Sequence, residues 1–183
     1  MDILEPKVIH DFNESEIHGK DVIKSSKYFK DIKDIYENPN GVKDDTLMYD
    51  VYSYFNGDQS NPVNLNYGMT VLHPVLVNGE CNMTRGHFHN DAKFPEIYVG
   101  LSGSGLLMMS NKEGYTFSEK VFKGSVHYID GNYSHRLINT GDDDLRVLCV
   151  WSPCAGHDYE SILKYKYKYR VFINNKEIVT KEI

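Results

Sequence analysis

The chain has 183 residues, of which 40% are hydrophobic and 25% charged, a composition and length that fit one globular domain, residues 1–183, able to bury a proper core. The formal net charge of −6 at pH 7 argues against nucleic acid as the main partner, because phosphate backbones select basic surfaces. No apolar run comes near the roughly 18 residues of a membrane span and no charged-then-apolar leader is present, so we expect no membrane segment and no signal peptide.

Residues 1–45 are rich in lysine, aspartate and glutamate, with scattered apolar side chains. Ile32, Ile35 and Tyr36 have helical spacing, which predicts a short amphipathic helix over residues 31–37. Asn38-Pro39-Asn40-Gly41 then ends it. We interpret this region as an N-terminal arm packed on the outside of the main body.

From Leu47 onwards the sequence is a series of short alternating segments separated by turn signals. Residues 67–77 are one extended stretch, interrupted by Pro74 and ended by Asn78-Gly79. Further strands are predicted at residues 81–89, 95–101, 105–110, 116–122, 125–129, 134–139 and 145–152. Short strands at this spacing, with 14 tyrosines and 8 phenylalanines in the chain, predict an all-β sandwich or barrel with its core in residues 46–160.

The stretch Tyr165–Val171 alternates aromatic and basic side chains. We interpret it as an amphipathic strand with tyrosines inward and lysines solvated, part of a C-terminal hairpin over residues 161–183 that turns at Asn174-Asn175. A nucleic-acid strip, with rings for base stacking and lysines for phosphate, is the alternative. The acidic character of the rest of the chain disfavours it.

The three cysteines, Cys81, Cys149 and Cys154, form no C-x-x-C pair and are odd in number. Structural disulfides are therefore not expected, and the default compartment is the reducing cytoplasm. We interpret these side chains as small buried hydrophobic groups rather than as metal ligands or nucleophiles.

Three histidines and one carboxylate form the most informative pattern. His87 and His89 are separated by one residue, so on a strand both project to the same side. Glu96 follows after a loop-length stretch, which we expect to let two strands pair and bring its carboxylate alongside the histidines. With His135 the set offers three nitrogens and one oxygen, which suits a first-row divalent metal with positions open for substrate. The remaining histidines lack such partners and are expected to be ordinary residues: His10, His18, His73 and His127.

Two spacings resemble the paired motifs of the cupin superfamily: His87-Phe88-His89, six residues, Glu96, six residues, Gly103, and later Gly124, ten residues, His135, three residues, Asn139. The second motif departs from the family at Asp130 and Asn132, where Pro and Gly are usual, but these positions shape a turn and do not bind the metal. The resemblance implies a double-stranded β-helix, or jelly-roll barrel, with an N-terminal arm and a C-terminal hairpin added here.

Within the cupins, most of residues 45–160 is similar to one branch, the cupin-type glucose-6-phosphate isomerases. The wide gap between His89 and Glu96 also suits this branch. The similar segments are Tyr49-Asp50-Val51-Tyr52, Thr70-Val71-Leu72, Thr84–His89, Pro95–Tyr98, Gly103-Ser104-Gly105, His135-Arg136, Asn139–Asp142 and Ala155–Tyr159. The resemblance implies a metal held by His87, His89, Glu96 and His135. The metal it implies first is Fe(II), and Mn, Ni or Zn could substitute for it.

The resemblance also implies a phosphorylated sugar as the substrate. The residues implied to bind it are Tyr49, Thr70, Thr84, Arg85, Gly86, Trp151 and Tyr159. Hydroxyls and a glycine N–H grip a phosphate without a large basic patch, and Arg85 adds charge at the same end. Trp151 stands where some members have Tyr, which removes one phosphate contact.

The implied reaction interconverts glucose 6-phosphate and fructose 6-phosphate, with Glu96, Tyr98 and His157 as candidate catalytic residues. In an enediol route Glu96 is the base and Tyr98 a helper, while His157 assists ring opening. A hydride shift, with the metal as Lewis acid, is the second route. Two other functions stay open: an Fe(II) dioxygenase that uses the same ligands, and a non-catalytic sugar-binding cupin. We also expect a homodimer that covers exposed sheet edges through the N-terminal arm and the C-terminal strand.

Overall fold

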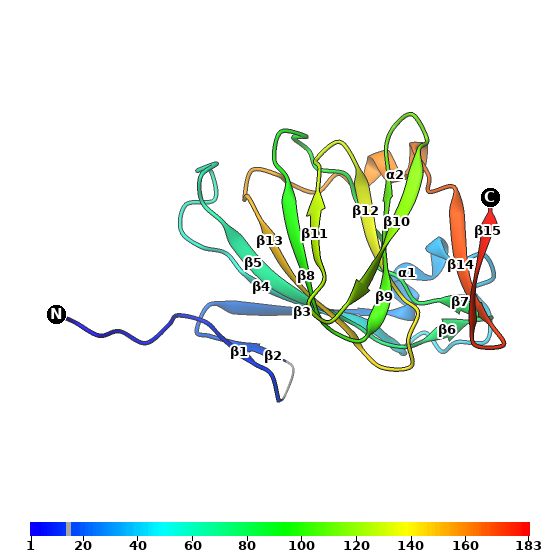
Figure 1. The fold of residues 1–183 in the computed structure, drawn as a ribbon, viewed down its shortest axis with the longest axis horizontal. Coiled ribbons are helices and arrows are strands. Elements are labelled where there is room, and N and C mark those ends of the chain that lie inside the picture. Colours follow the sequence, from blue (N-terminus) through cyan, green and yellow to red (C-terminus); the bar gives the residue numbers. More distant parts are fainter. Residues whose placement is uncertain (14–15) are drawn as a thin grey trace.

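The computed structural model describes residues 1–13 and 16–183 and consists mostly of antiparallel strands (Figure 1). The largest sheet, sheet I, has the order β11-β8-β13-β5-β4-β3. Its strands are β3 (Val22–Tyr28), β4 (Leu47–Tyr54), β5 (Asn66–Leu72), β8 (Glu96–Ser102), β11 (Val126–Ile129) and β13 (Leu145–Trp151). Sheet II has the order β10-β9-β12 and consists of β9 (Ser104–Ser110), β10 (Thr116–Phe122) and β12 (Ser134–Asn139).

Smaller elements flank these two sheets. Sheet III, with the order β15-β14-β7-β6, consists of β6 (Leu76–Val77), β7 (Glu80–Cys81), β14 (Tyr169–Asn174) and β15 (Glu177–Glu182). A separate ribbon pairs β1 (Ile9–Asp11) with β2 (Glu16–His18). The helices are α1 (Phe29–Ile32), a 3-10 turn (Lys33–Ile35) and α2 (Glu160–Lys164). Within the described part of the chain, no helix is long and apolar enough to cross a membrane.

Sheets I and II enclose the main hydrophobic core. Met48, Leu72 and Leu145 from sheet I and Leu107 and Leu137 from sheet II belong to one buried cluster, each at most 2% exposed. Side chains alternate faces along each strand, and β12 contributes to this core from both faces, through Leu137 and the adjacent Ile138. The predicted all-β jelly-roll architecture is confirmed.

The segment after Cys81 departs from the regular strand predicted over residues 81–89. Glu80–Cys81 pairs in β7, but the following residues form only isolated bridges: Met83↔Ile138, His87↔His135 and Phe88↔Asp158. Gly86 interrupts the pleat because its φ of +77° lies in the left-handed region that favours glycine. The segment 82–89 nevertheless runs along β12 and extends sheet II.

Part of the region interpreted as an arm is a strand of the main sheet. β3 is the edge of sheet I, paired with β4 from Val22↔Tyr54 to Tyr28↔Leu47. It also neutralises Asp50, a β4 side chain whose residue is only 6% exposed. The hydroxyl of Ser26 donates to Asp50 Oδ1 at 2.5 Å, and Lys24 Nζ lies 3.2 Å from Asp50 Oδ2.

The predicted helix over residues 31–37 is shifted towards the N-terminus. It begins at Phe29, where the Asp31 carboxylate accepts the Tyr28 backbone N–H at 2.9 Å, and passes into the 3-10 turn that ends at Ile35. The helix begins earlier because Phe29 belongs to its buried face: Phe29 and Ile32 are each 1% exposed and pack into the core. The apolar stripe therefore starts earlier than the Ile32, Ile35 and Tyr36 spacing indicates.

The C-terminal hairpin predicted from the alternating tail is present as β14 and β15. Tyr167 is 4% exposed while Lys166 and Lys168 are exposed, as predicted. Tyr165 and Tyr169 are only partly buried, and the strand begins at Tyr169 and not at Tyr165. The turn lies at Asn175-Lys176, with φ values of 49° and 66°, one residue beyond the predicted position. Helix α2, which the sequence patterns do not predict, follows Asp158, whose carboxylate accepts the Ser161 backbone N–H at 3.0 Å.

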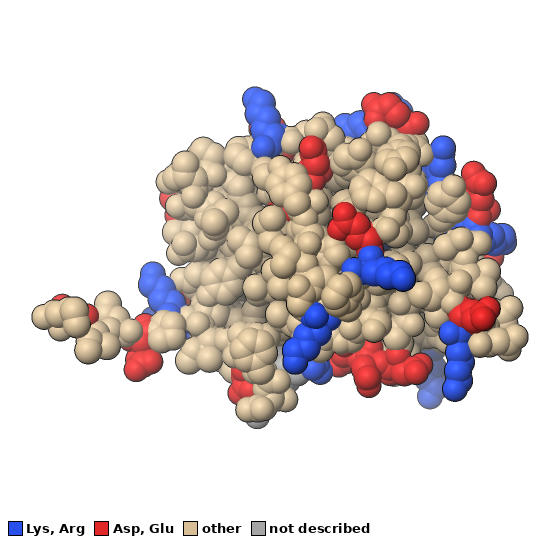
Figure 2. Space-filling view, viewed as in Figure 1, with Lys and Arg blue, Asp and Glu red and all other residues tan. Residues whose placement is uncertain are grey.

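Charged side chains are interspersed over the face drawn in Figure 2. Lysine and arginine lie there among acidic residues and do not gather over one element. This face therefore lacks the basic stripe that tracks a nucleic-acid backbone.

A buried amide ties the N-terminal segment to the barrel. Asn82, which is 0% exposed, donates to the carbonyls of Met48 at 2.7 Å and His73 at 2.8 Å and accepts the Tyr36 hydroxyl at 2.8 Å. Replacing Asn82 by leucine would remove all three bonds and leave the Tyr36 hydroxyl without its acceptor, whereas the Met48 and His73 carbonyls would each keep one backbone N–H donor. We expect Asn82→Leu to lower the free energy of unfolding by about 3 kcal/mol, measured by urea denaturation.

Asn40→Leu is the matched control, because Asn40 is exposed and bonds only to neighbouring polar groups. Its free energy of unfolding should stay within about 0.5 kcal/mol of the unsubstituted value. An equal loss in both variants would show that the Asn82 bonds do not stabilise the barrel.

Candidate active site

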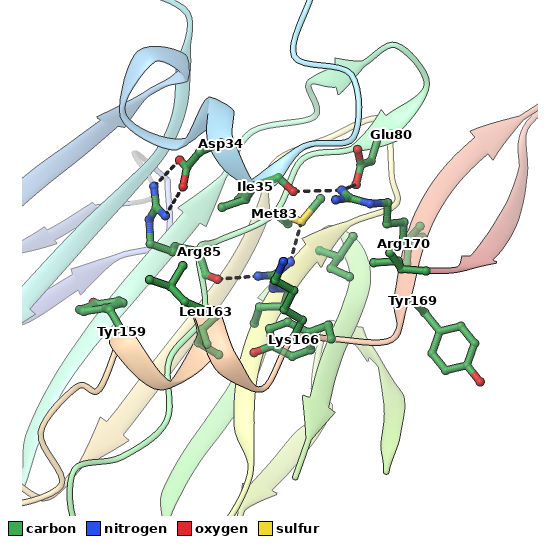
Figure 3. A pocket seen from close by; sticks show the side chains of 16 residues that line it. Asp34, Ile35, Glu80, Met83, Arg85, Tyr159, Leu163, Lys166, Tyr169 and Arg170 are labelled. Atoms are coloured by element: carbon green, nitrogen blue, oxygen red, sulfur yellow. Dashed lines mark hydrogen bonds and ion pairs between the residues drawn. The ribbon is translucent and has the colours of Figure 1, made fainter. Parts of the chain in front are cut away.

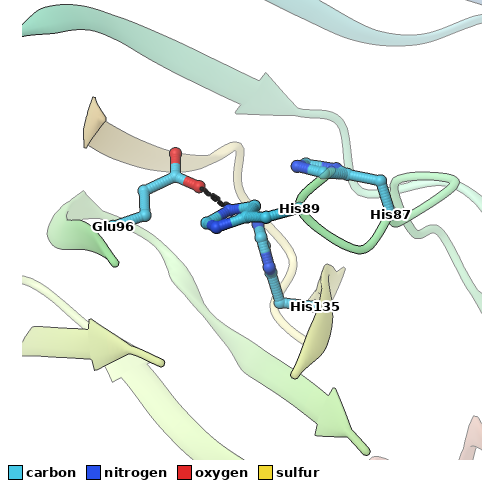
Figure 4. Close-up of side chains that lie close together, drawn as sticks. All are labelled: His87, His89, Glu96 and His135. Carbon is cyan, nitrogen blue, oxygen red and sulfur yellow. Dashed lines mark hydrogen bonds and ion pairs between the residues drawn. The ribbon is translucent and has the colours of Figure 1, made fainter. Parts of the chain in front are cut away.

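Four side chains from two distant parts of the sequence converge inside the barrel (Figure 4). They are His87 and His89 on the segment 82–89, Glu96 at the start of β8, and His135 on β12. One ligand atom from each lies within 4.8 Å of all the others. The predicted ligand set therefore meets at one point and could hold a metal ion.

The way these residues meet differs from the sequence prediction. The strands that carry His89 and Glu96 do not pair: His87 bridges His135 within sheet II, whereas β8 pairs with β11 and β13 in sheet I. Glu96 reaches the histidines from the opposite sheet. Its Oε2 lies 3.3 Å from His89 Nε2 and 3.2 Å from His135 Nε2.

A backbone carbonyl orients one of the candidate ligands. The carbonyl of Phe94 lies 2.7 Å from His89 Nδ1, a geometry that suits an Nδ1–H donor. That tautomer turns the lone pair of Nε2 towards the centre of the cluster. Metal-binding histidines are commonly fixed in this way through their second nitrogen.

The unpaired nitrogens of the cluster fit a cation. His87 Nε2 and both ring nitrogens of His135 are buried and have no hydrogen-bond partner among the described residues. Buried polar atoms are normally paired, and a divalent ion would satisfy the one lone pair that each neutral imidazole offers. Three imidazoles and one carboxylate suit first-row metals and leave coordination positions for other ligands.

The electrostatics of the cluster are set by burial and by one carboxylate. Burial alone would raise the pKa of Glu96, but the adjacent His135 and His89 imidazoles outweigh it and lower that pKa, so the carboxylate stays ionised. Burial opposes charge on His89, yet Glu96 outweighs this and raises its pKa. Burial lowers the pKa of His87 strongly and that of His157 to a lesser extent. His87 and His157 are therefore neutral near pH 7, the form that binds metals.

The cluster opens into a cavity of about 180 Å³ whose walls follow the strand period. His87, Glu96 and His135 line it, while His89 does not. Residues two positions apart on one strand line the cavity together, because their side chains share a face. These sets are Tyr49, Val51 and Ser53 on β4, Glu96 and Tyr98 on β8, His135 and Leu137 on β12, and Cys149 and Trp151 on β13.

All residues predicted to bind substrate or to act in catalysis line this cavity: Tyr49, Thr70, Thr84, Arg85, Gly86, Glu96, Tyr98, Trp151, His157 and Tyr159. The structure thus brings them together, and their individual roles stay predictions. The Thr84 hydroxyl accepts the Leu137 backbone N–H at 3.0 Å, so its own proton is available to a ligand. Burial raises the pKa of Tyr49 to about 12, so that phenol stays neutral.

Aromatic packing places His157 and Tyr159 at the mouth of this cavity. The ring of His157 stacks on Tyr159 with 6.0 Å between centroids and lies 4.3 Å from that of His87. The ring of Tyr98 meets His135 edge-on at 5.6 Å. Tyr159 is 50% exposed whereas Tyr98 is 7% exposed, so one aromatic residue lies at the rim and the other at depth.

Arg85 is held differently from the other cavity residues. Its guanidinium forms two hydrogen bonds with the Asp34 carboxylate, at 2.7 and 2.6 Å, and donates to the Asp31 carbonyl at 2.9 Å. The hydrogen bond from Arg85 lowers the pKa of Asp34, so the pair is ionised on both sides. From the sequence, Arg85 is expected to add positive charge at the phosphate-binding end of the site. In the structure that charge is already neutralised by the Asp34 carboxylate of the 3-10 turn.

Sequence reasoning does not identify five lining residues as part of the site: Val51, Ser53, Phe55, Leu137 and Cys149. Four of them lie two positions from a lining residue on the same strand, so the alternation from Tyr49, His135 or Trp151 is a signal that could have found them. Phe55 follows the end of β4 and carries no such signal. Cys81 and Cys149 are buried as predicted, and Cys154 is partly exposed.

Comparison with known proteins agrees with this geometry. The family model described as glucose-6-phosphate isomerase (GPI) matches residues 26–183. The glucose-6-phosphate isomerase of Pyrococcus abyssi is 31% identical over 173 residues, which span 92% of this chain and 89% of that protein. The corresponding proteins of Thermococcus litoralis and Sinorhizobium medicae are 32% and 31% identical, each over 75% of this chain and over 72% and 66% of their own lengths.

Solved structures show more distant likenesses. An oxalate decarboxylase from B. subtilis gives a TM-score of 0.45 at 19% identity, covering 57% of this chain and 25% of its own. CapF, a capsular polysaccharide assembling protein of Staphylococcus aureus, gives 0.47 at 17% identity over 61% and 29%. These likenesses have no bearing on activity. The match to the family model and the identity with whole-length relatives show that the chain belongs to the glucose-6-phosphate isomerase family.

Proposed function

We propose that this protein interconverts glucose 6-phosphate and fructose 6-phosphate, the activity named for its relatives. The observation that carries the proposal is that three of the four candidate ligands line a cavity whose walls also carry neutral donors. Thr70, Thr84 and Gly86 lie on the walls of that cavity. Hydroxyls and a backbone N–H suit a phosphate that must be bound and released.

The metal that we propose for this centre is Fe(II), with Mn, Ni or Zn able to substitute. The carboxylate and three imidazoles fit such an ion by donor type and by their unpaired nitrogens. When bound, the ion supplies Lewis-acid polarisation of the sugar carbonyl and hydroxyl oxygens.

Glu96 is the proposed base that moves the proton between C2 and C1 of the open-chain sugar. Its Oε2 faces His89 and His135, and within the described residues Oε1 takes part in no hydrogen bond. One carboxylate oxygen could therefore hold the metal while the other accepts the proton. The two roles proposed for Glu96, metal ligand and base, are thus compatible. Tyr98, two residues along the same face, holds its proton near neutral pH because burial raises its pKa strongly.

His157 is the proposed group for opening the sugar ring. It lines the cavity beside the stacked Tyr159, and desolvation lowers the pKa of its imidazole, which favours the neutral form. A neutral imidazole carries one N–H and one lone pair, so it can move a proton between ring oxygen and hydroxyl.

Metal titration of the chelator-treated protein tests the proposal. Apo protein should show no isomerase turnover in an anaerobic coupled assay with fructose 6-phosphate, and Fe(II), Mn(II) or Zn(II) should restore it. Turnover of another substrate only with O₂ consumption would favour a dioxygenase. A protein with no activity that keeps its sugar binding after chelation would favour a non-catalytic sugar-binding cupin.

Removing one cavity hydroxyl should weaken substrate binding. Thr70→Val keeps the β-branched shape on β5 but removes a donor to the phosphate, so we expect KM for fructose 6-phosphate to rise about tenfold with kcat little changed. Steady-state kinetics measure both constants. Thr180→Val on the exposed strand β15 is the control and should leave both unchanged; a Thr70→Val effect on kcat alone would contradict a phosphate-binding role.

We further propose that the protein is a cytoplasmic homodimer that acts in glycolysis and gluconeogenesis. The proposed substrates are intermediates of sugar breakdown inside the cell. The elements expected to form the dimer carry exposed apolar side chains: Ile9, Phe12 and Ile23 near the N-terminus and Ile178 and Val179 on β15. Sedimentation equilibrium should give a mass of twice 21.1 kDa, and a monomer at micromolar concentration would contradict this part of the proposal.

A further inference from the structure

β12 separates two cavities because its side chains alternate. His135 and Leu137 face the active-site cavity, whereas Arg136 and Ile138 line a second cavity of about 200 Å³. The segment 82–89 divides in a similar way, with Thr84 towards the first cavity and Met83 towards the second. Figure 3 shows the second cavity, between the helical segment after α1, helix α2 and β14.

Basic side chains outnumber acidic ones around this second cavity. Arg85 is paired with Asp34, as described above, and Arg170 donates to Glu80 at 2.7 Å and to the Ile35 carbonyl at 3.0 Å (Figure 3). These two arginines are neutralised by their carboxylates. Two further lining cations, Arg136 and Lys166, form no ion pair among the described residues, which leaves an excess of positive charge among the side chains that line the cavity.

Arg136 is a buried cation without a counter-charge. It is only 9% exposed, donates to the Arg85 carbonyl at 2.7 Å and contacts Met83 Sδ at 3.1 Å. Its Nε–H is buried and has no partner within residues 1–13 and 16–183, and the nearby Tyr167 hydroxyl is likewise unpaired. The guanidinium stacks over the Tyr167 ring at 4.0 Å, which stabilises the cation but brings no negative charge.

A buried guanidinium without an anion is costly, because desolvation is offset only by an opposite charge and by hydrogen bonds. Arginine offers five N–H donors, and the contacts above use two of them. The side chain that carries the unused donors lines an open cavity. This combination is the one that a bound anion would complete.

The walls of this cavity also indicate what the anion carries. Ile35, Ile138, Ile162, Leu163 and Val171 line it with apolar surface. The cavity is smaller than the roughly 300–1,000 Å³ that hold drug-sized ligands. We propose that it binds a small organic anion, a carboxylate or phosphate monoester on a short apolar body, with Arg136 and Lys166 holding the charged group.

Calorimetric titration of the metal-loaded protein tests this site with hexanoate, hexyl phosphate and hexanol. Hexanoate should bind with one-to-one stoichiometry and a Kd of about 1 mM or lower. Hexyl phosphate should bind at this site and also in the active-site cavity, and hexanol should bind much more weakly. The hexanoate affinity should be the same after chelator treatment. The experiment measures binding and not turnover, so its result does not depend on whether the protein is an isomerase.

Variants in the two cavities show where the anion binds. Lys166→Ala should weaken hexanoate about tenfold, the loss of one charge-assisted contact, and Arg136→Met should abolish measurable binding. Lys168→Ala, an exposed lysine on the same segment that does not line the cavity, should change nothing. Thr70→Val, in the active-site cavity, should change nothing either.

Three results would overturn the proposal. They are hexanol binding as tightly as hexanoate, Lys168→Ala matching the effect of Lys166→Ala, and Thr70→Val or chelation removing the binding. If Arg136→Met does not fold, Lys166→Glu takes its place and should abolish binding by reversing the charge at the rim. Retained binding in Lys166→Glu would also count against the site.

Discussion

Replacing His135 by alanine should remove metal binding and isomerase turnover together. His135 is one of the four candidate metal ligands, and its Nε2 lies 3.2 Å from the Glu96 carboxylate. Its loss therefore leaves the ligand set incomplete and removes a neighbour of the proposed base. We expect kcat/KM to fall by on the order of 10³ or more, several kcal/mol of transition-state stabilisation. Elemental analysis and the coupled assay measure the two effects.

His73→Ala is the matched control for this prediction. His73 pairs with Asp144 at 2.8 Å and does not line the active-site cavity, so its removal should leave metal content and turnover unchanged. A His135→Ala protein with a full equivalent of tightly bound metal would show that His135 is not a ligand.

Replacing Gly86 by alanine should be the most damaging single methyl addition at the site. The φ of Gly86 is +77°, and an added Cβ would lie 2.7 Å from Tyr167 Oη, 2.9 Å from the His135 carbonyl oxygen and 3.1 Å from Arg136 Cβ. The carbonyl belongs to a backbone that bridges to His87 and cannot move freely. We expect a loss of about 3–4 kcal/mol in the free energy of unfolding, with weaker metal binding as His87 is displaced.

Gly124→Ala separates conformational strain from the clash. Gly124 has a φ of +90°, yet an added Cβ would meet nothing within 4 Å, so only the backbone penalty of about 1–2 kcal/mol applies. Urea denaturation of both variants gives the difference, which is the cost of close approach. Equal losses would mean that the contact with the His135 carbonyl can relax without cost.

The ligand set could be predicted from the sequence because period-two spacing and side-chain chemistry are local properties. His87 and His89 share one side of an extended segment, and Glu96 starts the next strand, so few arrangements remain. The prediction that the strands carrying His89 and Glu96 pair with each other was wrong, because contacts with β11 and β13 decide to which sheet β8 belongs. Those contacts are long-range and leave no mark in the residues around Glu96.

Other features were hidden for specific physical reasons. β3 reads Val22-Ile23-Lys24-Ser25-Ser26-Lys27-Tyr28, and as an edge strand with mostly exposed side chains it shows little of the alternation that marks a half-buried strand. Arg85 looks like a phosphate ligand in sequence, but the distant Asp34 engages its guanidinium. The division of the chain at residues 45 and 160 and the roles of the cavity residues stay predictions.

The position of β3 sets a limit on how far the protein can be shortened. A chain that began at Leu47 would turn β4 into an open edge and leave the Asp50 carboxylate without Lys24 and Ser26. β4 carries Tyr49, Val51 and Ser53 on the active-site wall, so fraying there would reach the sugar pocket directly. The smallest autonomous fragment that keeps an intact pocket therefore has to begin at or before Val22, upstream of β4, which lines the active-site cavity.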